Sequence, residues 1–349
     1  MAELGFAEAI DRALESAMAA DDRILVIGED VEMLRQPLFV RFGSGRVLNA
    51  PISESAFLGA GLGAAMAGMR PVVEIMLVDF IAVAFDPLLN HAAKLEAFSG
   101  GRWNAPLTVR ASCGGGYGDG GQHEQCLWGM LSGIPGLAVV VPSTPADAAG
   151  LMLSALAHPG PVVYLEHKLL ADYWLDYLGG GGRENVSFDI PAAGARGEVA
   201  DPPAQVPIGE AATRREGDDL TMVAVGVAVH RAIEAADALA RDGVQSTVID
   251  LRSTAPLDRD AVVESVTRTG RVLVVDEDYR RGGLSGEIAA ILAEAGIRFG
   301  FARVTTGETV PYSRELEDRA LPSVERILAA AGRLADDSAL ACGAGRPAP

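Results

Sequence analysis

Apolar and polar positions divide the first 170 residues into short apolar runs separated by longer amphipathic stretches. An apolar run without alternation favours a strand buried on both faces, and helices between such strands favour a parallel sheet. The pattern therefore predicts an α/β domain. Its strands are predicted at 24–28, 71–77, 107–111, 137–141 and 162–166, and its helices at 6–20, 54–68, 79–98 and 145–157.

A second unit of the same kind follows after an interruption. Residues 171–206 break the rhythm with a run of glycines and several prolines, which predicts a linker or an insertion. The chain thus divides into domains at 1–170 and 207–335, with an Ala-, Gly- and Pro-rich tail at 336–349 that is predicted to be disordered. In the second domain, strands are predicted near 220–226, 246–251, 271–276 and 301–305, and helices near 229–241, 258–269, 284–296 and 322–334.

Charge and composition exclude several functions. The 349 residues include 29 Lys and Arg against 47 Asp and Glu, a net charge of −18, which argues against nucleic-acid binding and against a polybasic membrane patch. No apolar stretch reaches the roughly 18 residues of a membrane span, and the acidic N-terminus does not resemble a signal peptide. Three cysteines without a CxxC pair indicate a cytoplasmic protein without a disulfide framework.

Two glycine motifs need a structural context that the sequence does not supply. Gly59 to Ala64 has the GxGxxA spacing of a dinucleotide site, but no strand directly precedes it, so a helix with a small-residue face is favoured. An NAD-binding dehydrogenase remains an alternative. Gly118-Asp119-Gly120 is similar to the start of the thiamine diphosphate motif, but no asparagine lies between Asn104 and Asn185 to supply the second magnesium ligand. Asp119 is therefore expected in a flexible glycine loop.

Three polar residues stand at the ends of predicted strands or loops. Glu29 follows an apolar strand directly, Glu54 begins an alanine-rich helix, and His123 follows the glycine loop. The carboxyl ends of parallel strands face the ligand crevice, so Glu29 is a candidate site residue, although each of the three also suits an ordinary loop or helix-start position. The Asp276 to Asp278 segment is interpreted as a solvated acidic turn, and Cys113 and Cys126 as ordinary thiols.

Taken in order, many segments resemble the β subunit of the thiamine-diphosphate-dependent first component of 2-oxoacid dehydrogenase complexes. The resemblance extends from about residue 4 to 335. It implies a transketolase-like fold of two three-layer α/β domains with mainly parallel sheets. The segments are GEDV (28–31), RVLNAPISESAFLGAGLGAAMAGMRPVVEIM (46–76), DF (79–80), NHAAK (90–94), SGG (99–101), GGQHEQ (120–125), IPGLAVVVPSTPADAAGL (134–151), GPVVYLEHK (160–168), VIDLRSTAPLD (248–258) and TGRVLVVDE (269–277).

The resemblance also implies roles for individual residues. Glu54 matches the glutamate that binds the cofactor's pyrimidine nitrogen and drives its imino tautomer, and Met76 and Phe80 match positions that wall the pyrimidine. His123 matches a histidine that transfers protons or orients the substrate or the lipoyl group, and Glu29 an acid that links two active sites. Backbone carbonyls that hold a potassium ion in some members match Leu107, Ala155, Leu156, His158 and Gly160.

The implied function is oxidative decarboxylation of a 2-oxoacid, with transfer of the acyl group to a lipoylated acyltransferase. In this family an α subunit carries the complete diphosphate motif and its magnesium, so the resemblance implies an α2β2 heterotetramer in which this chain is inactive alone. Acetoin cleavage on the same residues and a catalytically silent partner chain are the alternatives.

Overall fold

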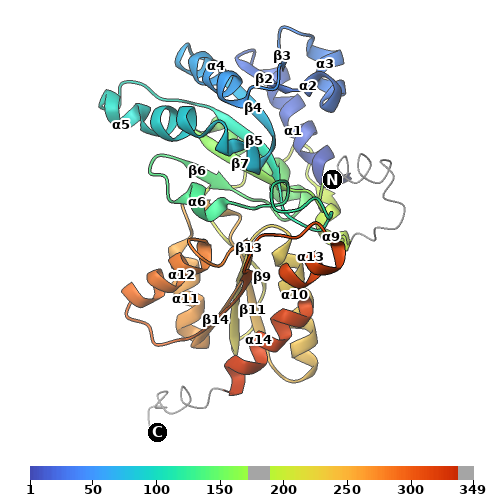
Figure 1. The fold of residues 1–349 in the computed structure, drawn as a ribbon, viewed down its shortest axis with the longest axis vertical. Coiled ribbons are helices and arrows are strands. Elements are labelled where there is room, and N and C mark those ends of the chain that lie inside the picture. The colour runs from blue at the N-terminus through green and yellow to red at the C-terminus, as the bar shows by residue number, and fades with distance from the viewer. Residues whose placement is uncertain (172–188, 337–349) are drawn as a thin grey trace.

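Two mainly parallel sheets, one above the other, make up the body of the chain (Figure 1). The computed structural model describes residues 1–171 and 189–336. The predicted tail lies outside this part of the chain except for residue 336, as does most of the first half of the 171–206 segment. Among the described residues, no helix combines the length and the apolar character that crossing a bilayer requires.

The larger sheet has seven strands, and all neighbours in it are parallel except β12 against β6. Its edge strand β12 comes from the second half of the chain, so the predicted boundary between the units is crossed by one strand. The order is β12 (Ser253–Ala255), β6 (Ala138–Val140), β7 (Val162–His167), β5 (Thr108–Cys113), β4 (Arg70–Leu77), β2 (Ile24–Glu29) and β3 (Val47–Ala50).

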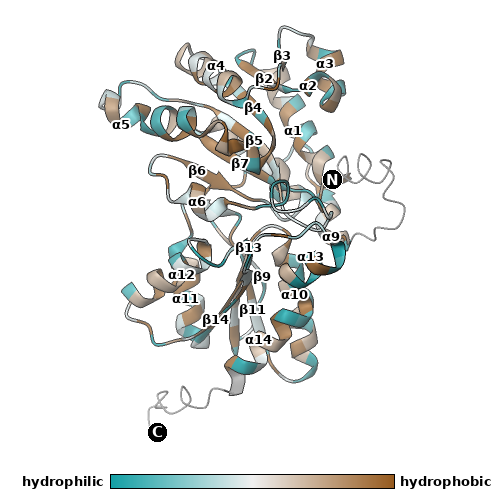
Figure 2. Ribbon diagram, viewed as in Figure 1, coloured by the Kyte–Doolittle hydropathy of each residue, from teal (hydrophilic) through white to brown (hydrophobic). Residues whose placement is uncertain are grey.

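The smaller sheet has five strands, of which only β9 runs antiparallel to its neighbour. Figure 2 shows the strands of both sheets as largely hydrophobic, while helices such as α10 (Ala228–Arg241) carry hydrophilic residues on their outer sides. The order is β14 (Gly300–Thr306), β13 (Arg271–Tyr279), β10 (Leu220–Ala224), β11 (Ser246–Asp250) and β9 (Ala212–Arg215).

Helices cover both faces of each sheet, as the uninterrupted apolar strands predict. In β4, Val72 belongs to the core under α1 (Phe6–Ala20) and α7 (Pro145–Ala157), whereas Val73 belongs to the core under α4 (Glu54–Met66). This alternation follows from the two-residue period of a strand. In the smaller sheet, α10 and α14 (Val324–Asp336) cover one face, and α11 (Arg259–Thr269) and α12 (Leu284–Glu294) the other. The predicted three-layer arrangement is confirmed for both units.

One apolar core passes from the first unit into the second. It joins residues under α4, such as Leu58, to residues under α11 and α12, such as Val266 and Ile288. Because burial of apolar side chains stabilises any arrangement that keeps them from water, this shared core holds the two sheets in a fixed relation. The remaining elements are α2 (Val31–Leu34), α3 (Gln36–Phe42), α5 (Leu95–Ser99), α6 (Trp128–Ser132), α9 (Ala192–Ala195) and α13 (Arg314–Ala320).

The helix predicted at 79–98 is wrong as a single element. The segment consists of a 3-10 turn at η1 (Val78–Ala82), a π turn at η2 (Pro87–His91), a second 3-10 turn at η3 (Ala92–Lys94) and only then α5. Pro87 lacks a backbone N–H and its ring crowds the preceding turn, so a regular helix cannot pass through it.

The described end of the predicted linker packs on the first unit. Within it, β8 (Arg196–Val199) pairs antiparallel with β1 (Ala2–Gly5). Further along, the Val206 carbonyl accepts a hydrogen bond from Ser154 of α7 at 2.6 Å. This stretch is therefore an integral edge of the larger unit.

The Gly59 to Ala64 motif lies inside α4, which confirms the helical interpretation and excludes the strand-to-helix turn of a dinucleotide site. Gly61 packs against β4 so closely that a Cβ there would lie 2.4 Å from Cγ2 of Val73. A Cβ on Gly63 would meet no atom within 4 Å. The two glycines, two positions apart on one helix, therefore have different surroundings.

Gly61→Ala should destabilise the chain by about 1–3 kcal/mol, because the added methyl group overpacks the contact with Val73. Gly63→Ala is the matched control, and it should leave stability unchanged or raise it by up to about 1 kcal/mol, since alanine is the better helix former. The measurement is the urea midpoint of the isolated chain. Equal midpoints for the two variants would contradict the close packing of α4 on β4.

Candidate active site

Glu54 is the first residue of α4, just beyond the carboxyl end of β3. Its side chain is buried, with 7% of the residue exposed. Within residues 1–171 and 189–336, no hydrogen bond or ion pair joins its carboxyl group to another group. Buried carboxyl groups in proteins nearly always have partners, so this one is available to a ligand or to another chain.

Glu29 ends β2 and lies beside the carboxyl end of β3, where it is level with Ala50. Burial raises the pKa of Glu29, and the negative charges of Asp30 and Glu54 raise it further. Glu29 also lines a small cavity of about 20 Å³, together with Met76 near the end of β4. The carboxyl ends of β2, β3 and β4 therefore bring Glu29, Glu54 and Met76 to the same edge of the sheet.

A buried network of charged side chains forms the other wall of this small cavity. Nε of Arg35 donates to both oxygens of Glu74 at 2.9 Å, and NH2 of Arg110 donates to Glu166 at 2.9 Å. NH1 of Arg110 donates to Asp11 at 2.8 Å, which ties α1 to the sheet. Loss of any one of these side chains would leave another charge buried without its partner, which strongly destabilises a fold. We therefore expect the network to hold this wall of the cavity in one arrangement.

The sequence did not predict this network. Each of two neighbouring apolar strands has a charged residue within it, Glu74 in β4 and Arg110 in β5, and the sheet register places these two residues opposite each other. A charged residue within an apolar strand was the feature of the sequence that could have indicated the network. Register depends on the tertiary pairing of strands, so the sequence alone does not show that these charges meet.

Phe80 and His123 lie together although 43 residues separate them. Their rings meet edge to face, with centroids 5.9 Å apart. Nδ1 of His123 lies 3.3 Å from the carbonyl oxygen of Asp119, which can only accept, so Nδ1 carries the proton and Nε2 is the basic nitrogen of the neutral ring. Nζ of Lys168 donates to the His123 carbonyl at 2.8 Å. His123 is thus held on both its ring and its backbone.

Among the described residues, Asp119 of the Gly118-Asp119-Gly120 segment is not part of a group of potential metal ligands. Oδ2 of Asp119 lies 4.0 Å from Nζ of Lys168. In the part of the chain that the structure describes, one group of three potential ligand atoms is close enough for a metal, namely Cys126, His167 and Glu277. However, the Leu169 N–H donates to Nδ1 of His167, so Nε2 bears the proton and donates it to Glu277 at 2.7 Å. The ring therefore has no free lone pair for a metal.

The interpretation of residues 276–278 as a solvated turn is wrong. All three carboxylates are buried, since β13 continues through them to Tyr279. Each accepts a hydrogen bond from the larger unit: Asp276 from Nε1 of Trp128 at 2.8 Å, Glu277 from His167, and Asp278 from the Gly129 N–H at 2.6 Å. Three buried acids thus join β13 to the loops of the first unit.

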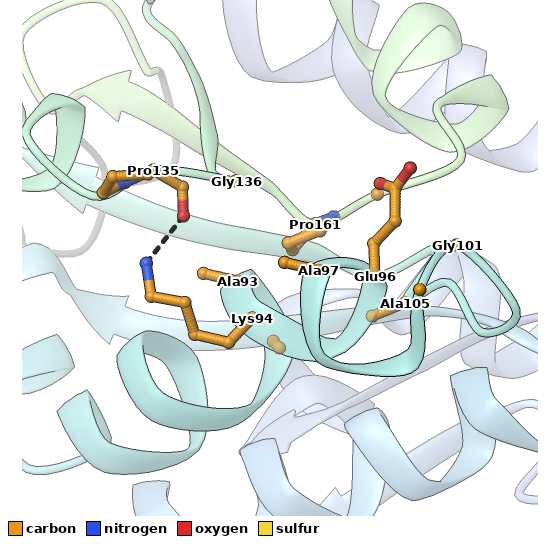
Figure 3. A pocket seen from close by; sticks show the side chains of 12 residues that line it. Ala93, Lys94, Glu96, Ala97, Gly101, Ala105, Pro135, Gly136 and Pro161 are labelled. Carbon is orange, nitrogen blue, oxygen red and sulfur yellow. Dashed lines mark hydrogen bonds between the residues drawn. The ribbon is translucent and has the colours of Figure 1, made fainter.

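One hollow of the first unit has none of the strand-end residues Glu29, Glu54 and Met76 in its lining. It has a volume of about 410 Å³ and is lined by small residues of the η3–α5 segment and of the 135–136 turn, with Lys94 donating to the Pro135 carbonyl at 2.8 Å (Figure 3). Of the predicted site residues, only Gly160 lines it. The candidate site is therefore the strand-end cluster and not this hollow.

Comparisons with known proteins identify the family. Residues 2–172 match the transketolase pyrimidine binding domain, and residues 209–327 match the transketolase C-terminal domain. Over 343 residues the chain is 37% identical to the β subunit of acetoin:2,6-dichlorophenolindophenol oxidoreductase of Cupriavidus necator, which covers 93% of this chain and 95% of the relative. It is 38% identical over 300 residues to the 2-oxoisovalerate dehydrogenase subunit β of Bacillus subtilis, covering 84% of this chain and 85% of the relative.

The chain belongs to this family of transketolase-like dehydrogenase β subunits. The resemblance and the transketolase-like fold expected from the sequence are thereby confirmed. A third relative, the mitochondrial pyruvate dehydrogenase subunit β-2 of Oryza sativa subsp. japonica, is 37% identical over 341 residues, covering 95% of this chain and 86% of the relative. A solved structure described as a split-gene transketolase, inactive β4 tetramer, has the same fold, with a TM-score of 0.77, 22% identity and coverage of 95% of this chain and 98% of that chain.

The positions matched to the potassium ligands of transketolase-like β subunits are partly occupied by a side chain. NH1 of Arg70 donates to the carbonyls of Leu156 at 2.8 Å and His158 at 3.5 Å. The Leu107 carbonyl accepts from the Val162 N–H at 2.9 Å. A guanidinium at two of these carbonyls does not fit a potassium ion there. The potassium site stays a prediction.

Asp276→Asn should make the stability of this β subunit less sensitive to pH. Burial, with the charge of Asp278, raises the pKa of Asp276 to about 8. The folded chain then keeps a proton that an unfolded aspartate releases near pH 4, so stability falls as the pH rises between about 4 and 8, by at most about 1.4 kcal/mol per pH unit. The asparagine oxygen still accepts from Trp128 but carries no charge.

We therefore expect the stability of Asp276→Asn relative to the parent chain to increase as the pH is raised from about 5 to 8, measured by urea unfolding. Asp260→Asn, at an exposed position of α11, is the control and should show no such trend. A constant difference between Asp276→Asn and the parent chain would contradict the neutral state of this buried acid.

Proposed function

We propose that the chain is the β subunit of the thiamine-diphosphate-dependent first component of a 2-oxoacid dehydrogenase, and that it supplies the pyrimidine half of a shared active site. The observation that carries the proposal is the buried carboxyl of Glu54, which has no partner in the described residues. A pyrimidine nitrogen is a hydrogen-bond acceptor that a protonated carboxyl satisfies, and Glu29 is a second acid at the same edge of the sheet. Donor and surroundings thus fit this end of the cofactor.

The other residues suit the remaining functions of such a site. Met76 and Phe80 offer apolar, partly exposed side chains to a flat ring. Thiamine diphosphate, when bound, supplies a thiazolium carbon that adds to the carbonyl of a 2-oxoacid. Glu54 would hold a proton at the far pyrimidine nitrogen, and Glu29 would exchange protons with it through water.

We propose that His123 accepts and donates protons at the reacting end. Because Nδ1 is fixed as the donor to the Asp119 carbonyl, Nε2 is the nitrogen that takes a proton from, or gives one to, the substrate or the lipoyl group. The edge-to-face contact with Phe80 limits rotation of the imidazole and excludes water from one side of it.

An α subunit is needed for the other half of the site. The Asp119 carboxylate faces Lys168, and no asparagine follows it at the spacing of a magnesium motif. A chain with a net charge of −18 also repels a diphosphate. We therefore infer that the α subunit holds magnesium and the diphosphate in an α2β2 heterotetramer, which passes the acyl group to a lipoylated acyltransferase.

Acetoin cleavage is the second candidate, because a relative that is 37% identical is named as an acetoin oxidoreductase subunit. The identity to the 2-oxoisovalerate relative is 38%, so overall similarity does not select the substrate. Activity of the reconstituted enzyme with pyruvate, branched 2-oxoacids and acetoin separates the two candidates. The presence of Glu54, Phe80 and His123 argues against a catalytically silent chain.

Glu54→Gln should lower turnover of the reconstituted enzyme by about 10²–10⁴-fold, the usual loss when one acid–base group is removed. A glutamine cannot pass a proton to the pyrimidine nitrogen, although it preserves the size of the side chain. Glu264→Gln, at an exposed position of α11, is the control and should retain full turnover. Steady-state kinetics with the preferred substrate makes the measurement, and near-normal turnover of Glu54→Gln would overturn the assignment.

The isolated chain should bind thiamine diphosphate weakly at any magnesium concentration, and addition of the α subunit should restore tight, magnesium-dependent binding. Titration calorimetry of the chain, with and without the α subunit, makes this comparison. Tight magnesium-dependent binding by the isolated chain would refute the shared site.

A further inference from the structure

Four backbone N–H groups of the glycine-rich loop 114–120 bind two buried carboxylates in alternation. Glu317, on α13 of the smaller unit, accepts from the N–H groups of Gly116 at 2.6 Å and Gly118 at 2.9 Å. Glu124, in the larger unit, accepts from Tyr117 at 2.9 Å and Gly120 at 3.0 Å. The two carboxyls thus alternate along four donors of one loop.

The loop conformation depends on its glycines. Gly116 has φ +108°, and Gly118 and Gly120 also have positive φ, which side-chain-bearing residues rarely adopt. When the sign of φ alternates from residue to residue, successive N–H groups turn toward one side of the backbone. They then form a concave surface that binds anions. In this chain the anions are its own side chains, since Glu124 is 1% exposed and Glu317 is 0% exposed.

His123 has two contacts with the same loop and one with Lys168, which follows β7. Its N–H donates to the Gly120 carbonyl at 3.0 Å, its Nδ1 lies on the Asp119 carbonyl, and its own carbonyl accepts from Lys168. A shift of residues 116–120 therefore moves the imidazole. Hydrogen bonds connect Glu317 of α13 to the loop and the loop to His123, so the position of α13 affects the position of His123.

The positive charges near Glu124 and Glu317 do not fully neutralise the negative charge that this region would have if both carboxyl groups were ionised. Lys168 lies on the Glu124 side, and NH1 of Arg314 donates to Glu317 at 2.9 Å. Glu277 of β13 and Asp119 add negative charge nearby, through contacts with Gly115 and Lys168. Burial raises the pKa of Glu124 to about 8, with Lys168 opposing the shift and Glu317 adding to it. At neutral pH the pair therefore holds one proton.

We propose that Glu317 and Glu124 are a positioning pair that fixes the 114–120 loop from both units and thereby sets the place of His123. The inference deepens the proposed function, on which the role of His123 rests. It assigns to the smaller unit, which contains none of the predicted site residues, a direct part in the reaction geometry.

Glu317→Gln is the first test, because its amide group places an NH2 opposite a backbone N–H where an oxygen accepted before. We expect turnover of the reconstituted enzyme to fall, on the order of 10²-fold for a displaced group, with little change in KM for the 2-oxoacid. Glu317→Asp keeps both oxygens and should recover part of the loss. Glu315→Gln, on the same helix but exposed and paired only with Arg319 in the described residues, is the matched control and should behave as the parent enzyme.

Hydrogen exchange of peptides covering 114–125, measured by mass spectrometry on the isolated chain, provides a readout that does not depend on activity. Glu317→Gln should lose protection in this segment, whereas Glu315→Gln should not. In the parent chain, the opening equilibrium corrected for intrinsic exchange should rise about tenfold per pH unit between about pH 6 and 8, because the open loop releases the proton held by the pair. Glu124→Gln should abolish this slope.

Unchanged protection and unchanged turnover in a folded Glu317→Gln variant would overturn the proposal. If that variant does not fold, the pH slope of the parent chain decides: a tenfold rise per unit supports the pair, and a flat profile overturns it. If the parent enzyme has no 2-oxoacid or acetoin activity with its α subunit while the exchange results hold, the proposed function fails and the loop assignment stands.

Discussion

The backbone N–H groups of the glycine-rich loop must find acceptors once they are buried, and this requirement connects the two units of the chain. The acceptors are carboxylates from both sides of the interface, Glu124 from the larger unit and Glu277 and Glu317 from the smaller one. An unsatisfied buried N–H costs about 1–3 kcal/mol, so five of them cannot be left without partners. The shared apolar core brings the two units together. The hydrogen bonds from the loop to Glu277 and Glu317 then fix the position of one unit relative to the other.

The same sheet geometry explains why the candidate site forms where it does. Parallel strands present all their carboxyl ends at one edge, so residues that follow β2 and β3 meet even though the chain leaves the sheet between them. Glu29, Glu54 and Met76 come from three neighbouring strand ends. The glycine loop then places His123 against Phe80, which follows β4.

Acidic residues outnumber basic ones, 47 to 29, and the structure shows that several of them are buried. Glu74, Glu166 and Asp11 neutralise Arg35 and Arg110 within the larger unit, and Asp276 to Asp278 bind groups of the opposite unit. Buried acids with partners cost less than they would alone, but each makes folding sensitive to proton concentration. The net charge of −18 therefore does not show which of the acidic residues face water.

The sequence alone determined the order of the main strands and helices, because burial on two faces leaves uninterrupted apolar runs and because α1 and α7 follow their periodicity residue for residue. It also determined the family, through segments whose order is specific, and with it the candidate site residues. It did not show that Pro87 divides a helix, that Glu74 meets Arg110, or that residues 276–278 are interior. Those properties depend on which groups become neighbours across a sheet or an interface, and only the tertiary structure decides whether an acidic residue faces water or a buried N–H.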